Sequence, residues 1–413
     1  MQIVMGILRG AHFDSIFYVL RMPVFLNRNL SALFIAASLS AAPIAAFAQS
    51  SVSETTFSTA APHAAILDFE TGEVLYQKDA GRPMAPASMT KIMTAEMVFN
   101  ALKSGRLTPE TEFTVSEEAW RRGGAKSGSS TMFLDLNSTV SVADLIRGVV
   151  IQSGNDACIV LAEGMAGSED AFASQMTARA REMGLSSATF RNATGWPHPE
   201  HNISAIDLAK LARAQIKNHP EFYPIYNERS FKWNGISQGN RNPLLGKFTG
   251  ADGLKTGHTE ISGYGLVGSA ERDGVRRIIV INGLESKSAR SSVSLSLMNS
   301  AFNEFKVYGL REAGDELARA QVFMGKAQDV GLALAAPITK GLHISERGKV
   351  KSRVEYRTAP APIAKGDQLA ELVVSIEGRQ DMRYPLFATE DVKAKSAFGK
   401  AWAVLIGKIR GEL

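Results

Sequence analysis

Apolar and polar residues alternate early in the chain and then change to a helical spacing. Residues 65–68 and 74–76 alternate on either side of Thr71-Gly72, which predicts a β-hairpin with a short turn. After Ser88 the apolar residues recur mostly at helical spacing, which predicts a helix that ends near Gly105. We therefore expect a strand pair that is followed by a helix.

The middle of the chain has a helical pattern, and strands return after it. Apolar runs at helical spacing cover residues 142–151 and 157–180. Residues 263–270 and 277–282 then alternate as two strands that are joined by a turn at Asp273-Gly274. Strands are thus expected on both sides of a helical middle.

A second strand pattern occupies about residues 310–390. Residues 350–356 and 372–376 alternate, and turn signals at 365–367 and 377–378 separate such runs. We predict a small β-rich domain here. It contains no catalytic group of residues, so a spacer or a partner surface is the expected role.

Length and charge limit the classes of protein that fit. A chain of 413 residues with 45% hydrophobic content can bury two domain cores. The formal net charge of +5 falls to +3 when residues 1–48 are left out. This excess is too mild to argue for a nucleic-acid partner.

The N-terminus has the pattern of a secretory signal peptide. Arg28 precedes an apolar run at 30–37, and Ala46-Phe47-Ala48 supplies small residues before a cleavage point at Gln49. We expect residues 1–48 to be removed on export to the periplasm, although a membrane anchor is the alternative. Residues 1–21 add nothing to such a signal, so Met22 is a candidate for the true start, with residues 1–21 not translated.

The single cysteine, Cys158, excludes an internal disulfide and a thiolate metal cluster. It lies in an apolar helical run, which predicts a buried and inert thiol.

Ser88 and Lys91 are the first candidates for chemistry. Residues at positions i and i+3 of a helix share one face, so the lysine can take the serine proton once its own pKa is lowered. A serine that caps a helix beside a solvated lysine is the simpler alternative.

Two further short motifs follow in the chain. A turn between apolar helices lets Ser153 and Asn155 point the same way, although an ordinary helix cap gives the same pattern. Thr256-Gly257 gives a strand edge with little side-chain bulk, along which another backbone can add. Lys255 would lower the pKa of Lys91 and attract an anionic ligand.

Two other patterns are weaker. The Gly/Ser-rich residues 120–131 fail as a phosphate-binding loop because Ala125 precedes Lys126, so we expect a flexible loop that borders a site. His198 and His201 lack a third clustered metal ligand, which favours solvated loop histidines.

The chain has one Ser-x-x-Lys, one Ser-x-Asn and one Lys-Thr-Gly sequence, in this order. It resembles the low-molecular-mass penicillin-binding proteins that act as D-alanyl-D-alanine carboxypeptidases (peptidase family S11). Residues 85–91, 152–158 and 252–259 carry the resemblance. It implies, for residues 55–305, an α/β (α+β) fold like that of β-lactamases and transpeptidases, with helices packed on an antiparallel sheet.

The resemblance also implies roles for the catalytic residues. Ser88 is similar to the family's nucleophile, Lys91 to its base and Ser153 to the serine that passes a proton to the leaving amine. The backbone N–H groups of Ser88 and His258 would form the oxyanion hole.

Substrate-binding roles follow from the same resemblance. Asn155 would hold Lys91 and the substrate backbone, while Lys255, Thr256 and Gly257 would bind the substrate along one strand. Arg290 aligns with an arginine that contacts the same terminal carboxylate as Lys255.

The implied function is removal of the terminal D-alanine from peptidoglycan stem peptides, with penicillin as a covalent inhibitor and with no cofactor or metal. A β-lactamase or esterase on the same fold is one alternative. Glu200 lies outside the Glu-x-x-x-Asn pattern that a class A β-lactamase needs, which disfavours it. A catalytically silent wall-binding protein is the other alternative.

Residues 392–413 form an apolar stripe at helical spacing, with basic residues mostly off the stripe. Trp402 suits a membrane interface, and the stretch is too short and too charged to span a bilayer. We expect an amphipathic helix on the outer face of the inner membrane. A helix packed on the β-rich domain is the alternative.

Overall fold

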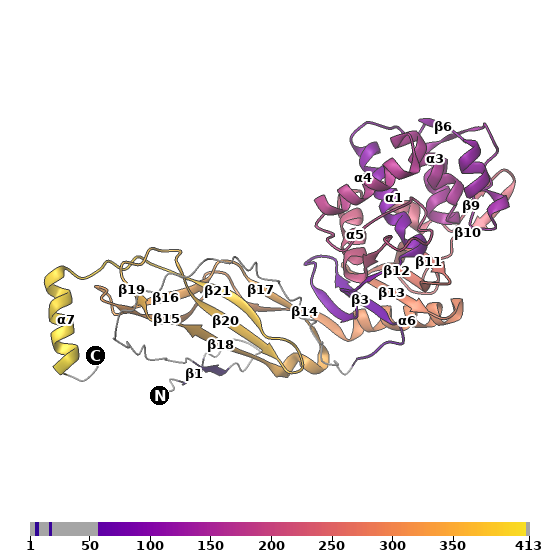
Figure 1. Cartoon of the computed structure of the whole chain (residues 1–413). Coiled ribbons are helices and arrows are strands. Elements are labelled where there is room, and N and C mark those ends of the chain that lie inside the picture. The colour runs from indigo at the N-terminus through magenta and orange to yellow at the C-terminus, as the bar shows by residue number, and fades with distance from the viewer. Residues whose placement is uncertain (1–4, 8–15, 19–56, 410–413) are drawn as a thin grey trace, which may run out of the picture. The chain divides into compact units, whose positions relative to one another are not determined.

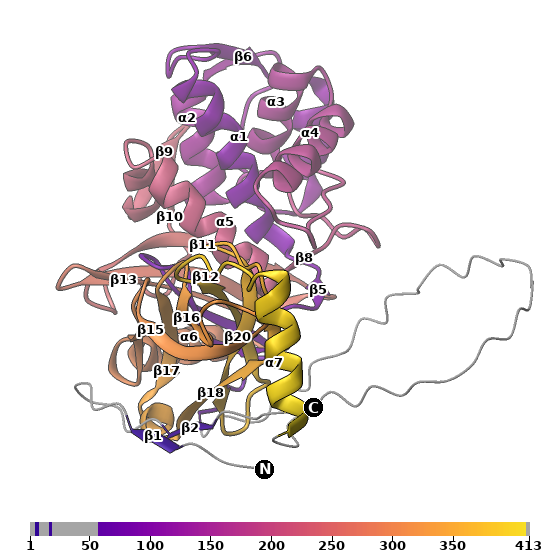
Figure 2. The same ribbon diagram turned by 90° about the vertical axis from the view of Figure 1, so that its left-hand side faces the viewer.

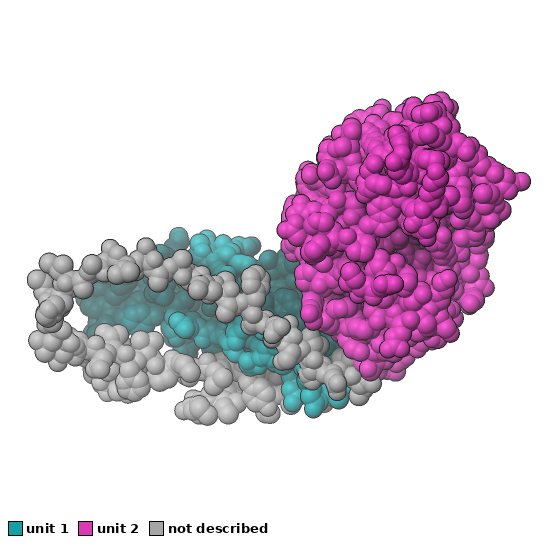
Figure 3. Space-filling view, turned by 45° about the vertical axis from the view of Figure 1, so that its right-hand side comes forward, with its two compact units in different colours: residues 1–56, 309–339, 345–413 teal, residues 57–308, 340–344 magenta. Residues whose placement is uncertain are grey.

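The computed structural model describes residues 5–7, 16–18 and 57–409, and the chain forms two compact units (Figure 3). Unit 1 comprises residues 1–56, 309–339 and 345–413, and unit 2 comprises residues 57–308 and 340–344.

The predicted signal peptide lies outside the described residues, except for one short strand pair. This pair consists of β1 (Met5–Ile7) and β2 (Ile16–Tyr18), which are antiparallel.

Unit 2 is built on a five-stranded antiparallel sheet. The predicted hairpin is confirmed as β3 and β4, and the two predicted strands near residue 270 are confirmed as β12 and β13. In spatial order the strands are β11 (Ala251–Thr259), β12 (Gly263–Arg272), β13 (Val275–Leu284), β3 (His63–Asp68) and β4 (Val74–Lys78).

Side-chain alternation along the strands buries both faces of this sheet. On β3, Ala65 and Leu67 join the core that includes α5 (Ala205–Asn218). Ala64 and Ile66 join the core that includes α6 (Lys287–Asn303). Because successive side chains of a strand point to opposite faces, this division covers the sheet on both sides. Figure 1 shows α6 on one side and α1 (Lys91–Lys103), α3 (Asn155–Ala166) and α4 (Glu169–Glu182) on the other.

The helices of unit 2 follow the predicted order. The helix predicted after Ser88 is confirmed, since it ends at Lys103. Ser168 caps α4 by accepting a hydrogen bond from the Ala171 N–H group, as serine does at many helix starts. In chain order, the first four α-helices of this unit are α1 (Lys91–Lys103), α2 (Val142–Arg147), α3 (Asn155–Ala166) and α4 (Glu169–Glu182).

Short elements complete this unit. Three antiparallel strand pairs are β5 (Pro83–Met84) with β8 (Ile203–Ser204), β6 (Glu112–Thr114) with β7 (Thr139–Ser141), and β9 (Ser230–Trp233) with β10 (Ile236–Gly239). A further pair, β14 (Phe305–Arg311) and β17 (Ile338–His343), follows α6.

Unit 1 holds a six-stranded sheet, as expected for a β-rich region (Figure 2). Leu332, Leu372 and Leu386 are fully buried in its core. In spatial order its strands are β18 (Val350–Tyr356), β20 (Gln368–Ile376), β21 (Met382–Ala388), β16 (Asp329–Leu334), β15 (Glu316–Phe323) and β19 (Ala359–Pro360).

The last described element is the helix α7 (Ala397–Ile409). Its large apolar residues Phe398 and Trp402 are 81% and 57% exposed. No helix in the described part of the chain is long and apolar enough to cross a membrane.

Candidate active site

Ser88 and Lys91 lie at the junction of two helical segments. Ser88 belongs to the 3-10 turn η1 (Ala87–Thr90), and Lys91 is the first residue of α1. The Lys91 Nζ atom donates a hydrogen bond to Ser88 Oγ over 3.0 Å. The predicted i and i+3 spacing therefore brings the hydroxyl and the amine into contact.

Lys91 is 1% exposed and makes two further hydrogen bonds, to Asn155 Oδ1 and to the Thr194 carbonyl oxygen, both over 2.7 Å. Burial, assisted by the positive charge of Arg241, lowers the pKa of Lys91 to about 8. Lys91 and Lys255 repel each other, as expected, and burial together with the charge of Lys91 lowers the pKa of Lys255 well below its usual value.

Ser153 and Asn155 stand on either side of a sharp turn. The short helix η4 (Gly148–Gln152) ends at Ser153, whose φ of 65° is left-handed, and α3 begins at Asn155. This turn directs Asn155 toward Lys91, while the Asn155 side-chain amide also donates to Ser129 Oγ over 2.9 Å. The residue is thus more than a helix cap.

Lys255 lies on β11, the edge strand of the five-stranded sheet. Its Nζ atom donates to Ser153 Oγ over 3.0 Å, and the residue is 3% exposed. Next to it, Gly257 has no room for a side chain, because an added Cβ atom would lie 2.7 Å from the Pro86 carbonyl oxygen. Thr256, between them, is 5% exposed.

His258 and Arg290 gather around one tyrosine. The His258 ring stacks on Tyr264 with a centroid distance of 3.8 Å, and the Arg290 guanidinium carbon lies 5.6 Å from the Tyr264 ring centroid. Burial lowers the pKa of both His258 and Arg290. Arg290 is 8% exposed, and its Nε atom has no hydrogen-bond partner among the described residues.

The chain of contacts Ser88–Lys91–Asn155 and the pair Ser153–Lys255 thus come from three motifs that lie far apart in sequence. No hydrogen bond between described residues connects Arg290 to these five side chains. Its charge is nevertheless close enough to lower the pKa of Lys255.

Sequence reasoning missed Arg241 and Thr194. Arg241 donates to Ser130 Oγ over 2.6 Å. No motif marks either residue, because Thr194 acts through its backbone carbonyl and Arg241 is one of many arginines in the chain. The Gly/Ser-rich segment 120–131 does border these residues, as predicted, through Ser129 and Ser130.

The expectation for the histidines was half wrong. His198 is exposed, but His201 is 2% exposed and hydrogen-bonds through Nε2 to Thr90 Oγ1 over 2.8 Å. Burial lowers its pKa to about 4. Within the described residues, no cluster of three or more potential metal ligands exists. The prediction for Cys158 is confirmed, since burial raises its pKa to about 12.

Comparisons with known proteins agree with these motifs. A family model described as D-alanyl-D-alanine carboxypeptidase, peptidase S11, matches residues 48–286, and one described as penicillin-binding protein 5, C-terminal domain, matches residues 305–394. The D-alanyl-D-alanine carboxypeptidase DacA of Haemophilus influenzae is 35% identical over 350 residues, which cover 84% of this chain and 88% of the relative.

Solved structures show the same likeness. The D-alanyl-D-alanine carboxypeptidase DacD of Francisella tularensis superimposes with a TM-score of 0.72 and 30% identity, over 83% of this chain and 95% of its own. Penicillin-binding protein D2 of Listeria monocytogenes, in its ampicillin-bound form, gives a TM-score of 0.53 and 28% identity over 60% of this chain and 100% of its own. This chain therefore belongs to the D-alanyl-D-alanine carboxypeptidase family, peptidase S11, and carries that family's C-terminal domain.

Proposed function

We propose that this protein removes the terminal D-alanine from peptidoglycan stem pentapeptides through an acyl-enzyme on Ser88. One observation carries the proposal. The Ser88 hydroxyl lies 3.0 Å from the amine of Lys91, a buried lysine whose pKa is lowered to about 8. A neutral amine in this position can act as a base close to neutral pH.

In the first step the Ser88 Oγ atom attacks the carbonyl carbon of the penultimate D-alanine, and Lys91 takes the hydroxyl proton. The backbone N–H groups of Ser88 and His258 stabilise the oxyanion that forms. The C–N bond then breaks, Ser153 gives its proton to the leaving amine, and the proton that Lys91 took from Ser88 is passed on to Ser153, so that Lys91 is neutral again. D-Alanine leaves, and an ester remains on Ser88.

In the second step a water molecule attacks the ester and gives up a proton to Lys91. The ester bond breaks, the shortened peptide leaves as a carboxylic acid, and Ser88 regains its proton. Asn155 keeps Lys91 in place through both steps, since its side-chain oxygen accepts a hydrogen bond from Nζ over 2.7 Å.

The substrate's terminal carboxylate is the partner of the cations at this site. Lys255 forms no ion pair with any residue that the structure describes, and neither does Arg290, so an anion would balance both charges. The free edge of β11 can accept the peptide as an added strand along Lys255, Thr256 and Gly257.

Penicillin would acylate Ser88, and the resulting acyl-enzyme would be hydrolysed slowly. A class A β-lactamase speeds this release with a loop glutamate. Glu200 does not suit that task, because its side chain is 65% exposed and pairs with Arg191 over 2.8 Å. This contact favours a carboxypeptidase over a β-lactamase.

For its location, we propose export by the signal peptide at residues 1–48 and attachment to the outer face of the inner membrane through residues 392–413. Phe398 and Trp402 support the attachment, because large apolar side chains on a terminal helix favour a membrane interface. The β-rich region at 310–390 would act as a spacer between this helix and the catalytic domain at 55–305.

Chromatography of a stem pentapeptide tests the reaction. We expect the purified protein to release one D-alanine and to leave a tetrapeptide, and the Ser88→Ala variant to release none. Intact pentapeptide with both proteins would favour the silent wall-binding alternative, while rapid penicillin hydrolysis would favour the β-lactamase.

A further inference from the structure

Lys91 has a hydrogen-bond partner that none of the three motifs supplies. This partner is the carbonyl oxygen of Thr194, 2.7 Å from Nζ, in the loop between α4 and β8. The same loop is tied to α1 one residue earlier, where the Thr94 hydroxyl donates to the Ala193 carbonyl oxygen over 2.7 Å. The position of the loop backbone at Ala193 and Thr194 therefore helps to set the position of the Lys91 amine.

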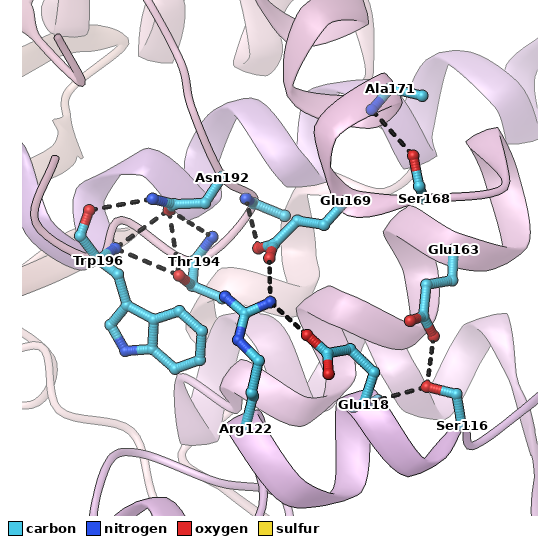
Figure 4. A network of polar contacts seen from close by, with 12 residues as sticks. Ser116, Glu118, Arg122, Glu163, Ser168, Glu169, Ala171, Asn192, Thr194 and Trp196 are labelled. Carbon is cyan, nitrogen blue, oxygen red and sulfur yellow. Dashed lines mark hydrogen bonds and ion pairs between the residues drawn. The ribbon is translucent and has the colours of Figure 1, made fainter.

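The side chain of Asn192 stabilises the turn in this loop by binding its backbone (Figure 4). Its Oδ1 atom accepts hydrogen bonds from the backbone N–H groups of Thr194, Gly195 and Trp196 over 3.2, 2.7 and 3.1 Å. Gly195 has a φ of +87°, and a Cβ atom on it would lie 1.9 Å from the Ala87 carbonyl oxygen. The loop thus packs directly on the turn that carries Ser88.

Glu169 holds the same loop from outside. It is the first residue of α4, and its side chain is 10% exposed. One carboxylate oxygen, Oε1, accepts a hydrogen bond from the Ala193 N–H group over 3.0 Å. The other, Oε2, pairs with Arg122 over 3.3 Å. A single carboxylate therefore fixes the backbone at Ala193, one residue before the Thr194 carbonyl that contacts Lys91.

Arg122 anchors Glu169 to a third part of the chain. It also pairs with Glu118 over 2.7 Å, and its guanidinium carbon lies 5.1 Å from the centre of the Trp196 ring (Figure 4). Arg122 belongs to the short helix η2 (Ala119–Gly123), whose Gly123 leaves no room for a Cβ atom against the Asp156 backbone. The network therefore joins the start of the Gly/Ser-rich segment 120–131 to the loop that contacts Lys91.

The charge of Glu169 also acts on Lys91. Burial is the main cause of the lowered pKa of Lys91, and Glu169 opposes it by raising that pKa. The other ionisable groups that face Lys91 come from several elements: Cys158 and Asp156 on α3, Arg241 before β11, Lys255 on β11, and His201 in the loop before β8. Glu169 differs from these groups because its carboxylate binds the backbone one residue before the carbonyl that contacts the Lys91 amine.

We propose that Glu169 is a positioning residue for Lys91. It fixes the Ala193 N–H group, one residue before the Thr194 carbonyl that holds the Lys91 amine, and its negative charge favours the protonated form of Lys91. This inference rests on the proposed function, because it assumes that Lys91 is the base for acylation of Ser88.

The test measures the rate of acylation by a penicillin at pH values on both sides of about pH 8, near the pKa of Lys91. Because the neutral amine is the active form, the rate rises with pH through this pKa. Glu169→Gln keeps an oxygen for the Ala193 N–H group but removes the charge. We expect the rise to move to lower pH, with little change in the rate reached at high pH.

Glu169→Ala removes the hydrogen bond as well. We expect the same move to lower pH and, in addition, a roughly tenfold lower rate at high pH. Glu182→Gln is the matched control, since it removes a carboxylate from the far end of the same helix, where Glu182 is 67% exposed and pairs with Arg179. It should leave both the rate and its pH dependence unchanged.

The proposal would be overturned if the acylation rate of both Glu169 variants rose at the same pH as that of the unchanged protein, even if the variants were slower or less stable. A shift of the rate profile to lower pH in Glu182→Gln would also overturn it, because the shift would then be caused by the change in net charge of the protein. An unchanged protein that neither reacts with penicillin nor cleaves the pentapeptide would refute the proposed function itself.

Discussion

The Nζ atom of Lys255 lies 3.0 Å from the Oγ atom of Ser153, so the second and third motifs meet in one hydrogen bond. Both residues are buried, at 3% and 1% exposure. In the proposed mechanism, a proton that passes from Ser153 to the leaving amine would start beside the Lys255 amine.

The two side chains should act as a unit in catalysis. We expect Ser153→Ala and Lys255→Ala each to lower the rate of pentapeptide cleavage by roughly a hundredfold, as removal of a proton-transfer group does. The double variant should be hardly slower than the slower single variant, with a coupling energy of about 1–3 kcal/mol. Rates measured for all four proteins give this energy. Effects that simply add would show that the two residues work separately.

Arg290 should recognise the charge of the substrate's terminal carboxylate. Arg290→Ala should slow cleavage of the free-acid pentapeptide by roughly ten- to a hundredfold more than cleavage of its C-terminal amide, because only the acid loses a charged hydrogen bond. Steady-state kinetics on both peptides measure the difference. Arg272→Ala is the control, since Arg272 packs on Phe248 away from the motifs. An equal loss on both peptides would remove Arg290 from the carboxylate site.

His201 should make the protein less stable in mild acid. Its pKa is about 6.5 when unfolded and is lowered by burial to about 4 in the folded protein, so the unfolded chain binds the proton first. The stability that the neutral ring contributes is complete above pH 6.5 and is lost as the pH falls toward 4. We expect the free energy of unfolding to fall by about 2 kcal/mol between about pH 7 and pH 5 because of this residue.

Urea unfolding at both pH values tests this prediction. His201→Gln should lose this part of the pH dependence, although it also loses hydrogen bonds to Thr90 and Arg191 and so has lower stability throughout. His198→Gln, at an exposed position, is the control. If the pH dependence of His201→Gln matched that of the unchanged protein, the buried neutral ring would not be its source.

The C-terminal helix should hold the protein on membranes without a part in catalysis. A chain that ends at Asp391 should cleave a free peptide at the normal rate and stay in the supernatant when membranes are sedimented. A milder variant, Phe398→Ser with Trp402→Ser, keeps the helix but removes two exposed apolar side chains, and should also be released. If both variants still sediment with membranes, another surface binds the lipid.

Sequence reasoning reached the residues whose role depends on a side chain in a short motif. Ser88 and Lys91 are neighbours on one helical face, so their contact follows from spacing alone. The contact between Ser153 and Lys255 depends on how a helix turn meets the edge of the sheet, and the sequence did not predict it. The strands were found because alternation is a local pattern.

Other contacts could not be predicted from any sequence motif. Thr194 meets Lys91 through a backbone carbonyl, which any residue type could supply. Glu169 looks like an ordinary acidic residue in the first turn of a helix, and its contact with the Ala193 N–H group depends on the folded loop. The lack of a third metal ligand favours a solvated His201, but the loop turns the ring inward onto Thr90.

The most direct test of the account is the covalent labelling of Ser88 by a fluorescent penicillin. We expect the purified protein to gain the mass of one penicillin, with the label on the peptide that contains Ser88, and the Ser88→Ala variant to gain none. A Ser88→Ala protein that is still labelled, or a label on another residue of the unchanged protein, would contradict the assignment of Ser88 as the nucleophile.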